Sequence, residues 1–215
     1  SKRPSIPQKP TVERLSDTER WSRANTARSS RQAFFELSQS EDAQVLKERT
    51  TQEIEKLFSR TPPNLDRWPF YQAVIQVYGK NAADDEELSL LARVASDSKQ
   101  PLTLRDTAFR AYVENMLRLD TGIKADDSTL SLIDGLFVEK NSLQETALQA
   151  EHFLLKNDAL ARERESVFSE RLRTTLEDSQ QAESVRVIAL NILSEIQATD
   201  DAQLRKLYQD AGVQM

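Results

Sequence analysis

The chain has 215 residues and a formal net charge of −6; 38% of its residues are hydrophobic and 30% are charged. This length suits one domain or two small ones, and the apolar content argues against global disorder. The absence of cysteine excludes a disulfide framework, a thiol nucleophile and a cysteine-ligated metal site. Four glycines are too few for a turn-rich all-β fold, so the composition favours an all-α protein.

The first ten residues, SKRPSIPQKP, contain three prolines and three basic side chains. This composition predicts an extended, Pro-rich linker over residues 1–10. No later stretch approaches the roughly 20 apolar residues of a membrane span, so we expect any membrane anchor to lie upstream of residue 1. Two locations fit the sequence: the chain is either an extracytoplasmic domain of an anchored protein or a cytoplasmic protein.

Residues 11–38 are predicted to form a basic N-terminal helical segment. Residues 1–35 hold eight basic and three acidic side chains, which leaves a net charge of −11 for the remaining residues. We expect Trp21, Phe34 and Phe35 to cover the end of the first repeat, with the arginines on the solvent-exposed face of the segment. The candidate partner-binding residues are Arg20, Arg23, Arg28 and Arg31.

The next predicted helices span residues 41–58 and 69–78, with the breaker Thr-Pro-Pro-Asn at residues 61–64 between them. Gly79 is expected to cap the end of the second helix. An aromatic cluster in this region is interpreted as packed core, with a binding hot spot as the alternative. Its members are Trp68, Phe70, Tyr71 and Tyr78.

An internal repeat with a period near forty follows. Residues 97–109 (DSKQPLTLRDTAF) align without gaps with residues 178–190 (DSQQAESVRVIAL), and residues 143–150 match the same pattern in part. The aligned alanines are Ala108, Ala147 and Ala189. We expect these alanines where paired helices approach most closely.

A second repeated signal is the pattern Asp-Asp-x-x-Leu, which begins at Asp84, Asp126 and Asp200. Acidic residues favour the positive end of a helix, so each doublet predicts a helix start. The period requires one further start, which we place near Asn157 and Asp158.

Residues 39–215 are therefore predicted to form a repeat domain of helix pairs, each joined by a polar turn. The last helix, at residues 201–208, has no partner, as expected of a terminal unit. The predicted pairs are 84–95 with 101–119, 128–138 with 143–155, and 163–176 with 184–196.

These units resemble the HEAT-like family of α-solenoids. The resemblance lies in Asp97 with Leu104-Arg105 and Ala108, and in the equivalent set Asp178, Val185-Arg186 and Ala189. It implies a right-handed stack of about four antiparallel helix pairs, in which the acid and the arginine link neighbouring turns as a structural ladder. The middle unit has Gln144 where the arginine is expected. A tetratricopeptide array is the structural alternative, but its shorter period and its signature are missing.

The sequence predicts no enzyme and no cofactor. A single histidine, His152, excludes a multi-histidine metal site, and neither a phosphate-binding loop nor a nucleophile elbow is present. We interpret His152 as an ordinary helix residue. The acidic run at residues 84–87 could bind a hard cation, but helix capping is the favoured interpretation.

Two functions fit this pattern. The favoured function is a non-catalytic scaffold that presents a helical-repeat surface to a protein partner, whose identity the sequence does not reveal. The alternative is an adaptor whose basic arm docks on a membrane surface or on nucleic acid, although the overall negative charge disfavours nucleic acid. The salt dependence of binding distinguishes the scaffold function from the adaptor function.

Overall fold

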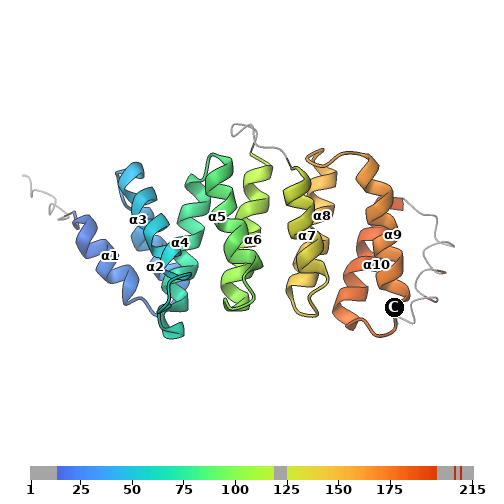
Figure 1. Cartoon of the computed structure of the whole chain (residues 1–215), viewed down its shortest axis with the longest axis horizontal. Coiled ribbons are helices and arrows are strands. Elements are labelled where there is room, and N and C mark those ends of the chain that lie inside the picture. Colours follow the sequence, from blue (N-terminus) through green and yellow to red (C-terminus); the bar gives the residue numbers. More distant parts are fainter. Residues whose placement is uncertain (1–13, 119–124, 198–205, 207–208, 210–215) are drawn as a thin grey trace, which may run out of the picture.

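The computed structural model describes residues 14–118, 125–197, 206 and 209, and within them the chain is helical with no strand (Figure 1). This confirms the predicted all-α class. The helices are α1 Asp17–Asn25, α2 Ser30–Ser38, α3 Ala43–Lys56, α4 Trp68–Asn81, α5 Asp85–Ser96, α6 Leu102–Met116, α7 Asp127–Phe137, α8 Leu143–Lys156, α9 Glu163–Glu177 and α10 Glu183–Gln197, with a short 3-10 turn, η1 Leu65–Arg67.

The helices form pairs that follow one another along the long axis of the molecule, and the pairs together build two layers (Figure 1). Each odd-numbered helix packs on the even-numbered helix that follows it. The even-numbered helices also pack on one another, from α2 to α10. In the odd-numbered layer α5 packs on α7, but α3 and α5 do not pack extensively. The layer of even-numbered helices is therefore the continuous one.

The basic segment at residues 11–38 contains two helices rather than one arm. α1 packs on α2, and α2 packs on α4. The described residues therefore contain five consecutive pairs, one more than the predicted stack of about four. The last predicted helix, at residues 201–208, and the doublet at Asp200 lie outside the described residues, apart from Lys206, which is helical and exposed.

Two of the predicted Asp-Asp starts are confirmed. The Asp84 carboxylate accepts a hydrogen bond from the Glu87 amide and caps α5. Asp126 forms a capping box with Thr129 at the start of α7. The start expected near residues 157–158 is wrong, because Asn157 ends α8 and Asp158 adopts a positive φ of 56°. The next helix begins at Glu163, where the apolar pattern places it.

Gly79 does not cap a helix, contrary to expectation. It lies inside α4, where a Cβ atom would approach the Cβ of Ala111 to 2.6 Å. The side-chain Nδ2 atom of Asn115 donates a 2.9 Å hydrogen bond to the Gly79 carbonyl oxygen. The residue is therefore glycine because α4 and α6 cross closely at this point.

The repeated turns have the same geometry in the two best-matched units. The Arg105 Nε atom donates to the Ala95 carbonyl oxygen at 2.8 Å, and Arg186 Nε donates to the Leu176 carbonyl oxygen at 2.9 Å. The acidic partner of Arg105 is Glu139, in the turn after α7, rather than Asp97. An arginine thus links neighbouring turns, but the acid comes from the following unit.

The buried core divides into two clusters. The larger cluster runs from α1 to α8, and the smaller one is formed by α9 and α10 with Leu148 of α8. Ala108, Ala147 and Ala189 are fully buried. The α9 helix is also joined to its neighbours by charge: the carboxylates of Asp134 and the fully buried Glu151 each pair with the same two arginines. The arginines are Arg164 and Arg171.

Candidate functional site

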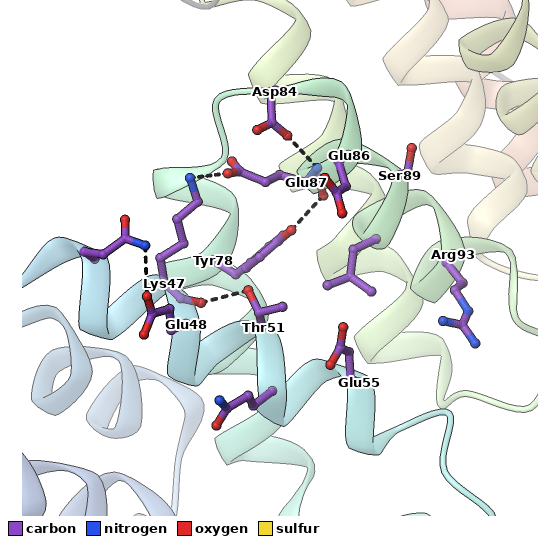
Figure 2. A pocket seen from close by; sticks show the side chains of 13 residues that line it. Lys47, Glu48, Thr51, Glu55, Tyr78, Asp84, Glu86, Glu87, Ser89 and Arg93 are labelled. Carbon is purple, nitrogen blue, oxygen red and sulfur yellow. Dashed lines mark hydrogen bonds and ion pairs between the residues drawn. The ribbon is translucent and has the colours of Figure 1, made fainter.

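A groove of about 580 Å³ separates α3 from α5 (Figure 2). One wall comes from the α3 residues between Gln44 and Glu55, and the other comes from the α5 region between Asp84 and Arg93. Tyr78 of α4 contributes to the floor. The groove exists because the odd-numbered helices are spaced apart here while the α4 and α6 helices beneath them pack closely.

The floor of the groove is polar and satisfied. Tyr78 is buried, and its hydroxyl donates a 3.0 Å hydrogen bond to the carbonyl oxygen of Glu87. Burial raises the pKa of Tyr78, and the negative charges of Glu87, Asp84, Glu86 and Glu55 raise it further. The phenol is therefore a neutral structural group rather than a base.

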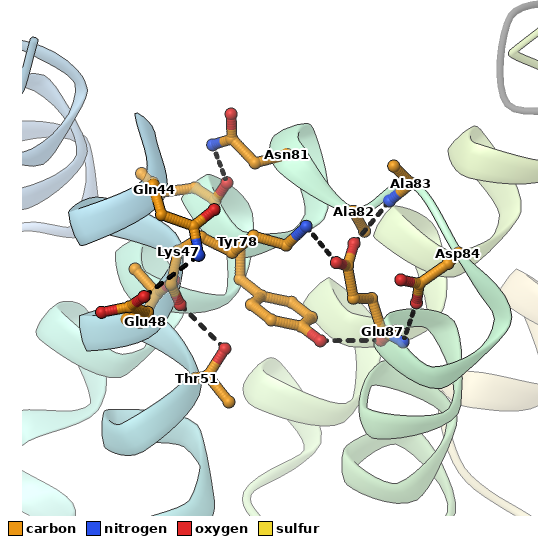
Figure 3. A network of polar contacts seen from close by, with 12 residues as sticks. Gln44, Lys47, Glu48, Thr51, Tyr78, Asn81, Ala82, Ala83, Asp84 and Glu87 are labelled. Atoms are coloured by element: carbon orange, nitrogen blue, oxygen red, sulfur yellow. Dashed lines mark hydrogen bonds and ion pairs between the residues drawn. The ribbon is translucent and has the colours of Figure 1, made fainter. Parts of the chain in front are cut away.

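One ion pair crosses the groove. The Lys47 ammonium on α3 contacts the Glu87 carboxylate on α5 (Figure 3). Glu87 also accepts a 2.5 Å hydrogen bond from the Ala83 amide, and Asp84 accepts a 2.9 Å bond from the Glu87 amide. Both carboxylates are thus committed to the start of α5, in agreement with the capping interpretation.

Other carboxylates remain available. Glu55 on α3 and Glu86 on α5 are exposed, and in the described part of the chain neither accepts a hydrogen bond nor forms an ion pair. The side chain of Glu48 accepts a 3.0 Å hydrogen bond from Gln44. Five acidic and two basic residues line the groove, which gives its lining a net charge of −3.

The one lining arginine, Arg93, forms no ion pair with these acids among the described residues. The Arg93 guanidinium lies 3.9 Å from the centre of the Phe58 ring, in a cation–π contact. Among the described residues, no group of three or more histidine, cysteine or acidic side chains could hold a metal ion. The arrangement instead offers separated carboxylates on two facing walls, which suits recognition of several cationic groups along a chain.

The predicted arginines do not form this groove. Arg20 is partly exposed and the other three candidates are exposed, and within the described residues none forms a hydrogen bond or ion pair. They are distributed over α1, the α1–α2 loop and α2. Arg31 lines a separate hollow of about 460 Å³ between α2, α4 and α6.

The aromatic expectations are correct in part. Trp21 is buried, with its ring centre 6.1 Å from that of Phe70, as expected for a residue that covers the end of the stack. Phe34 is partly buried, but Phe35 is 59% exposed, so its expected docking is wrong. In the α4 cluster, Trp68 is 43% exposed, contrary to the core interpretation. The cluster's other three aromatics are buried, as expected.

His152 is a partly buried helix residue. Its Nε2 atom lies 3.1 Å from Glu195, and its ring stacks on that of Phe168 with 6.5 Å between the ring centres. It borders a hollow of about 370 Å³ across α6, α8 and α10. Arg110 and Glu114 line this hollow and also the one beside Arg31.

Comparison with known proteins gives no match: no protein family, no curated protein and no solved structure is similar to the chain. No helix within the described residues has the length and apolar character needed to cross a membrane.

Proposed function

We propose that the chain is a non-catalytic protein-interaction module whose α3–α5 groove binds a basic, extended segment of a partner. The observation that carries this proposal is the position of Glu55 and Glu86, which are exposed and unpaired on opposite walls of one groove. A basic segment in the groove would gain charge-assisted contacts on both sides.

The architecture supports a scaffold of the HEAT-like kind as part of this proposal. Such repeats share several features with this chain, namely consecutive helix pairs, one continuous helix layer, and equivalent turn arginines, here Arg105 and Arg186. The right-handed superhelical course remains part of the proposal. In a repeat scaffold the binding surface lies on the helices and requires no special catalytic residues.

Single exposed ion pairs contribute about 0 to 1 kcal/mol, so several contacts along the groove are needed for useful affinity. The binding should also weaken as ionic strength rises, because the Debye length is about 8 Å at physiological salt. We therefore expect binding that requires several ion pairs and that weakens as the salt concentration rises.

The test is fluorescence anisotropy with a labelled octa-lysine peptide and a labelled octa-glutamate control at low salt. We expect the wild-type chain to bind octa-lysine in a salt-sensitive way and not to bind octa-glutamate. The double substitution Glu55→Lys with Glu86→Lys should weaken binding about tenfold or more. The matched control, Glu170→Lys with Glu177→Lys on α9, has the same charge change on exposed residues elsewhere. Equal effects of the two double variants would reject the groove as the site.

A second candidate function rests on the four exposed or partly exposed arginines of α1, the α1–α2 loop and α2. In it, Arg20, Arg23, Arg28 and Arg31 dock the chain on an anionic membrane surface or on nucleic acid. Co-sedimentation with phosphatidylserine vesicles and a DNA mobility shift test it directly. Steeply salt-dependent binding that charge reversal of the four arginines abolishes would favour this adaptor function; no binding in either assay would exclude it.

A further inference from the structure

A hollow of about 590 Å³ lies between the connection that joins α3 to α4 and the turn that joins α5 to α6. One side comes from residues 57–64 and the other from residues 97–101. Tyr71 of α4 and Leu104 of α6, both buried, also line it. Its lining shares only Arg93 with that of the α3–α5 groove, so the two are separate sites.

Polar contacts hold the two sides of this hollow together. The side-chain Nε2 atom of Gln100 donates to the Leu57 carbonyl oxygen at 3.2 Å and to the Asp97 carboxylate at 2.9 Å. The Asp97 carboxylate also accepts a 3.1 Å hydrogen bond from the backbone amide of Lys99. The hollow is therefore formed before any ligand binds, and a preorganised site loses less free energy to ordering on binding.

The hollow is positively charged, although the chain as a whole carries a net charge of −6. Three basic residues, Arg60, Arg93 and Lys99, line it against the single acid Asp97, which gives the lining a net charge of +2. Arg60 and Lys99 are exposed, and within the described residues neither side chain forms a hydrogen bond or an ion pair. Carboxylates of a partner would meet complementary charge here.

Trp68 supplies an apolar anchor at the same place. It is the first residue of α4, its side chain is 43% exposed, and in the described part of the chain its indole N–H donates no hydrogen bond. The other rings of the lining include Tyr71, Pro62, Pro63 and Pro101. Tryptophan, tyrosine and arginine are enriched at binding hot spots, and grooves lined by aromatic rings bind proline-rich segments. Such segments have no internal backbone hydrogen bonds, so their carbonyl groups can accept one from an indole.

We propose that this hollow is a second interaction site, which binds an acidic, proline-containing segment of a partner protein. The prolines of that segment pack on Trp68, and its carboxylates pair with Arg60 and Lys99. Both features are needed, because exposed ion pairs are individually weak. The inference does not rest on the function proposed for the α3–α5 groove, since none of these three residues lines that groove.

Trp68 is also the reporter for the test. The chain has two tryptophans, and the other, Trp21, is 7% exposed, so acrylamide quenches mainly the fluorescence of Trp68. The probe is a peptide of three Glu-Leu-Pro repeats, whose prolines share one edge of a polyproline II helix. We expect this peptide to reduce the quenching in a saturable way. A peptide of three Lys-Leu-Pro repeats lacks the negative charge, and octa-glutamate lacks the apolar anchor, so both should leave the quenching unchanged.

Substitutions test the two halves of the site separately. Arg60→Glu with Lys99→Glu should weaken binding of the Glu-Leu-Pro probe about tenfold or more. The matched control is Lys140→Glu with Arg173→Glu, the same charge change at exposed positions in the α7–α8 turn and on α9, and it should bind like the wild type. Trp68→Ala should weaken binding of a fluorescein-labelled probe by at least as much, measured by anisotropy, with its helical circular dichroism spectrum retained.

Three outcomes would overturn the inference. Equal effects of the two charge-reversal variants would show that the hollow is not the site. Equal protection of Trp68 by the Lys-Leu-Pro peptide would reject an acidic ligand. Protection that grows with protein concentration in the absence of any peptide would show that a second copy of the chain occupies the hollow in place of a partner.

Discussion

Arg105 shows how a single buried charge is accommodated. The side chain is 2% exposed, and its donors meet the Ala95 carbonyl oxygen and both oxygens of Glu139. A buried guanidinium is tolerated only when its hydrogen bonds are satisfied in this way. The repeated hydrophobe-Arg pair identified the position of this residue, but its acidic partner, in the turn after α7, carried no repeated signal.

We predict that Glu139→Gln destabilises the fold by about 1.5 to 3 kcal/mol at pH 7, as expected for loss of a charge-assisted hydrogen bond. The hydrogen bond from Arg105 lowers the pKa of Glu139 below its usual value, against the effect of burial. The stability from this pair is therefore present above the unfolded-state pKa of about 4.3 and is lost as the pH falls through the lower folded-state pKa. Denaturant melts between pH 3 and pH 7 should show the difference between wild type and variant shrinking in acid. A constant difference, with Glu177→Gln as control, would contradict this assignment.

Gly79→Ala is predicted to cost about 1 to 3 kcal/mol, because its Cβ would lie 2.6 Å from the Cβ of Ala111. The matched control is Gly135→Ala in α7, where a Cβ meets no atom within 4 Å. There alanine should stabilise the helix by up to about 1 kcal/mol. Urea melts of both variants measure this contrast, and changes of the same sign would reject the close crossing of α4 and α6.

At the scale of elements, we expect the buried repeated alanines to lie where paired helices meet. Ala108→Leu on α6 should overpack the core by about 1 to 3 kcal/mol. Arg110→Ala on the same helix should cost under about 0.5 kcal/mol, because Arg110 is 57% exposed and, among the described residues, its ion pair is with Asp106. Thermal and denaturant melts that treat the two variants alike would show that the helix is rotated from the described orientation.

The docking of α1 depends on one aromatic side chain. Trp21 contacts Phe70, and the Arg49 guanidinium lies 4.1 Å from the centre of its indole ring. We predict that Trp21→Ala costs about 3 to 5 kcal/mol, while Phe35→Ala, at an exposed position, costs under about 0.5 kcal/mol. Equal losses in melts followed by circular dichroism would place α1 away from the stack.

Much of the helix pattern could be predicted from the sequence, because amphipathic spacing and acidic starts are local signals. The helix start predicted near Asn157 is wrong because the repeat period places a start there, whereas the local residues end α8. The groove could not be predicted, since its walls come from stretches some thirty residues apart and their separation depends on packing beneath them. One signal was available: Gln44, Glu48, Thr51 and Glu55 form a polar stripe at helical spacing on α3.

At the scale of the whole molecule, the last helix pair is a partly separate unit. Its apolar cluster is distinct from the main core, and Glu151 joins it to α8 through Arg164 and Arg171. Glu151→Gln removes a fully buried charge from between two arginines and should cost about 3 to 5 kcal/mol. Hydrogen exchange should accelerate in α9 and α10 well before it does in α4 and α6. Uniform acceleration along the chain would show a single cooperative unit instead.

The continuous layer of even-numbered helices also determines how the molecule responds to force. Packed side chains resist compression, so we expect the layer of even-numbered helices to resist bending. The facing layer has little packing between α3 and α5, so a change in the bend of the molecule there would change the width of the groove. The Lys47–Glu87 ion pair bridges this gap, and salt screens the attraction between the two charges. We therefore expect the groove between α3 and α5 to be wider at high ionic strength than at low ionic strength.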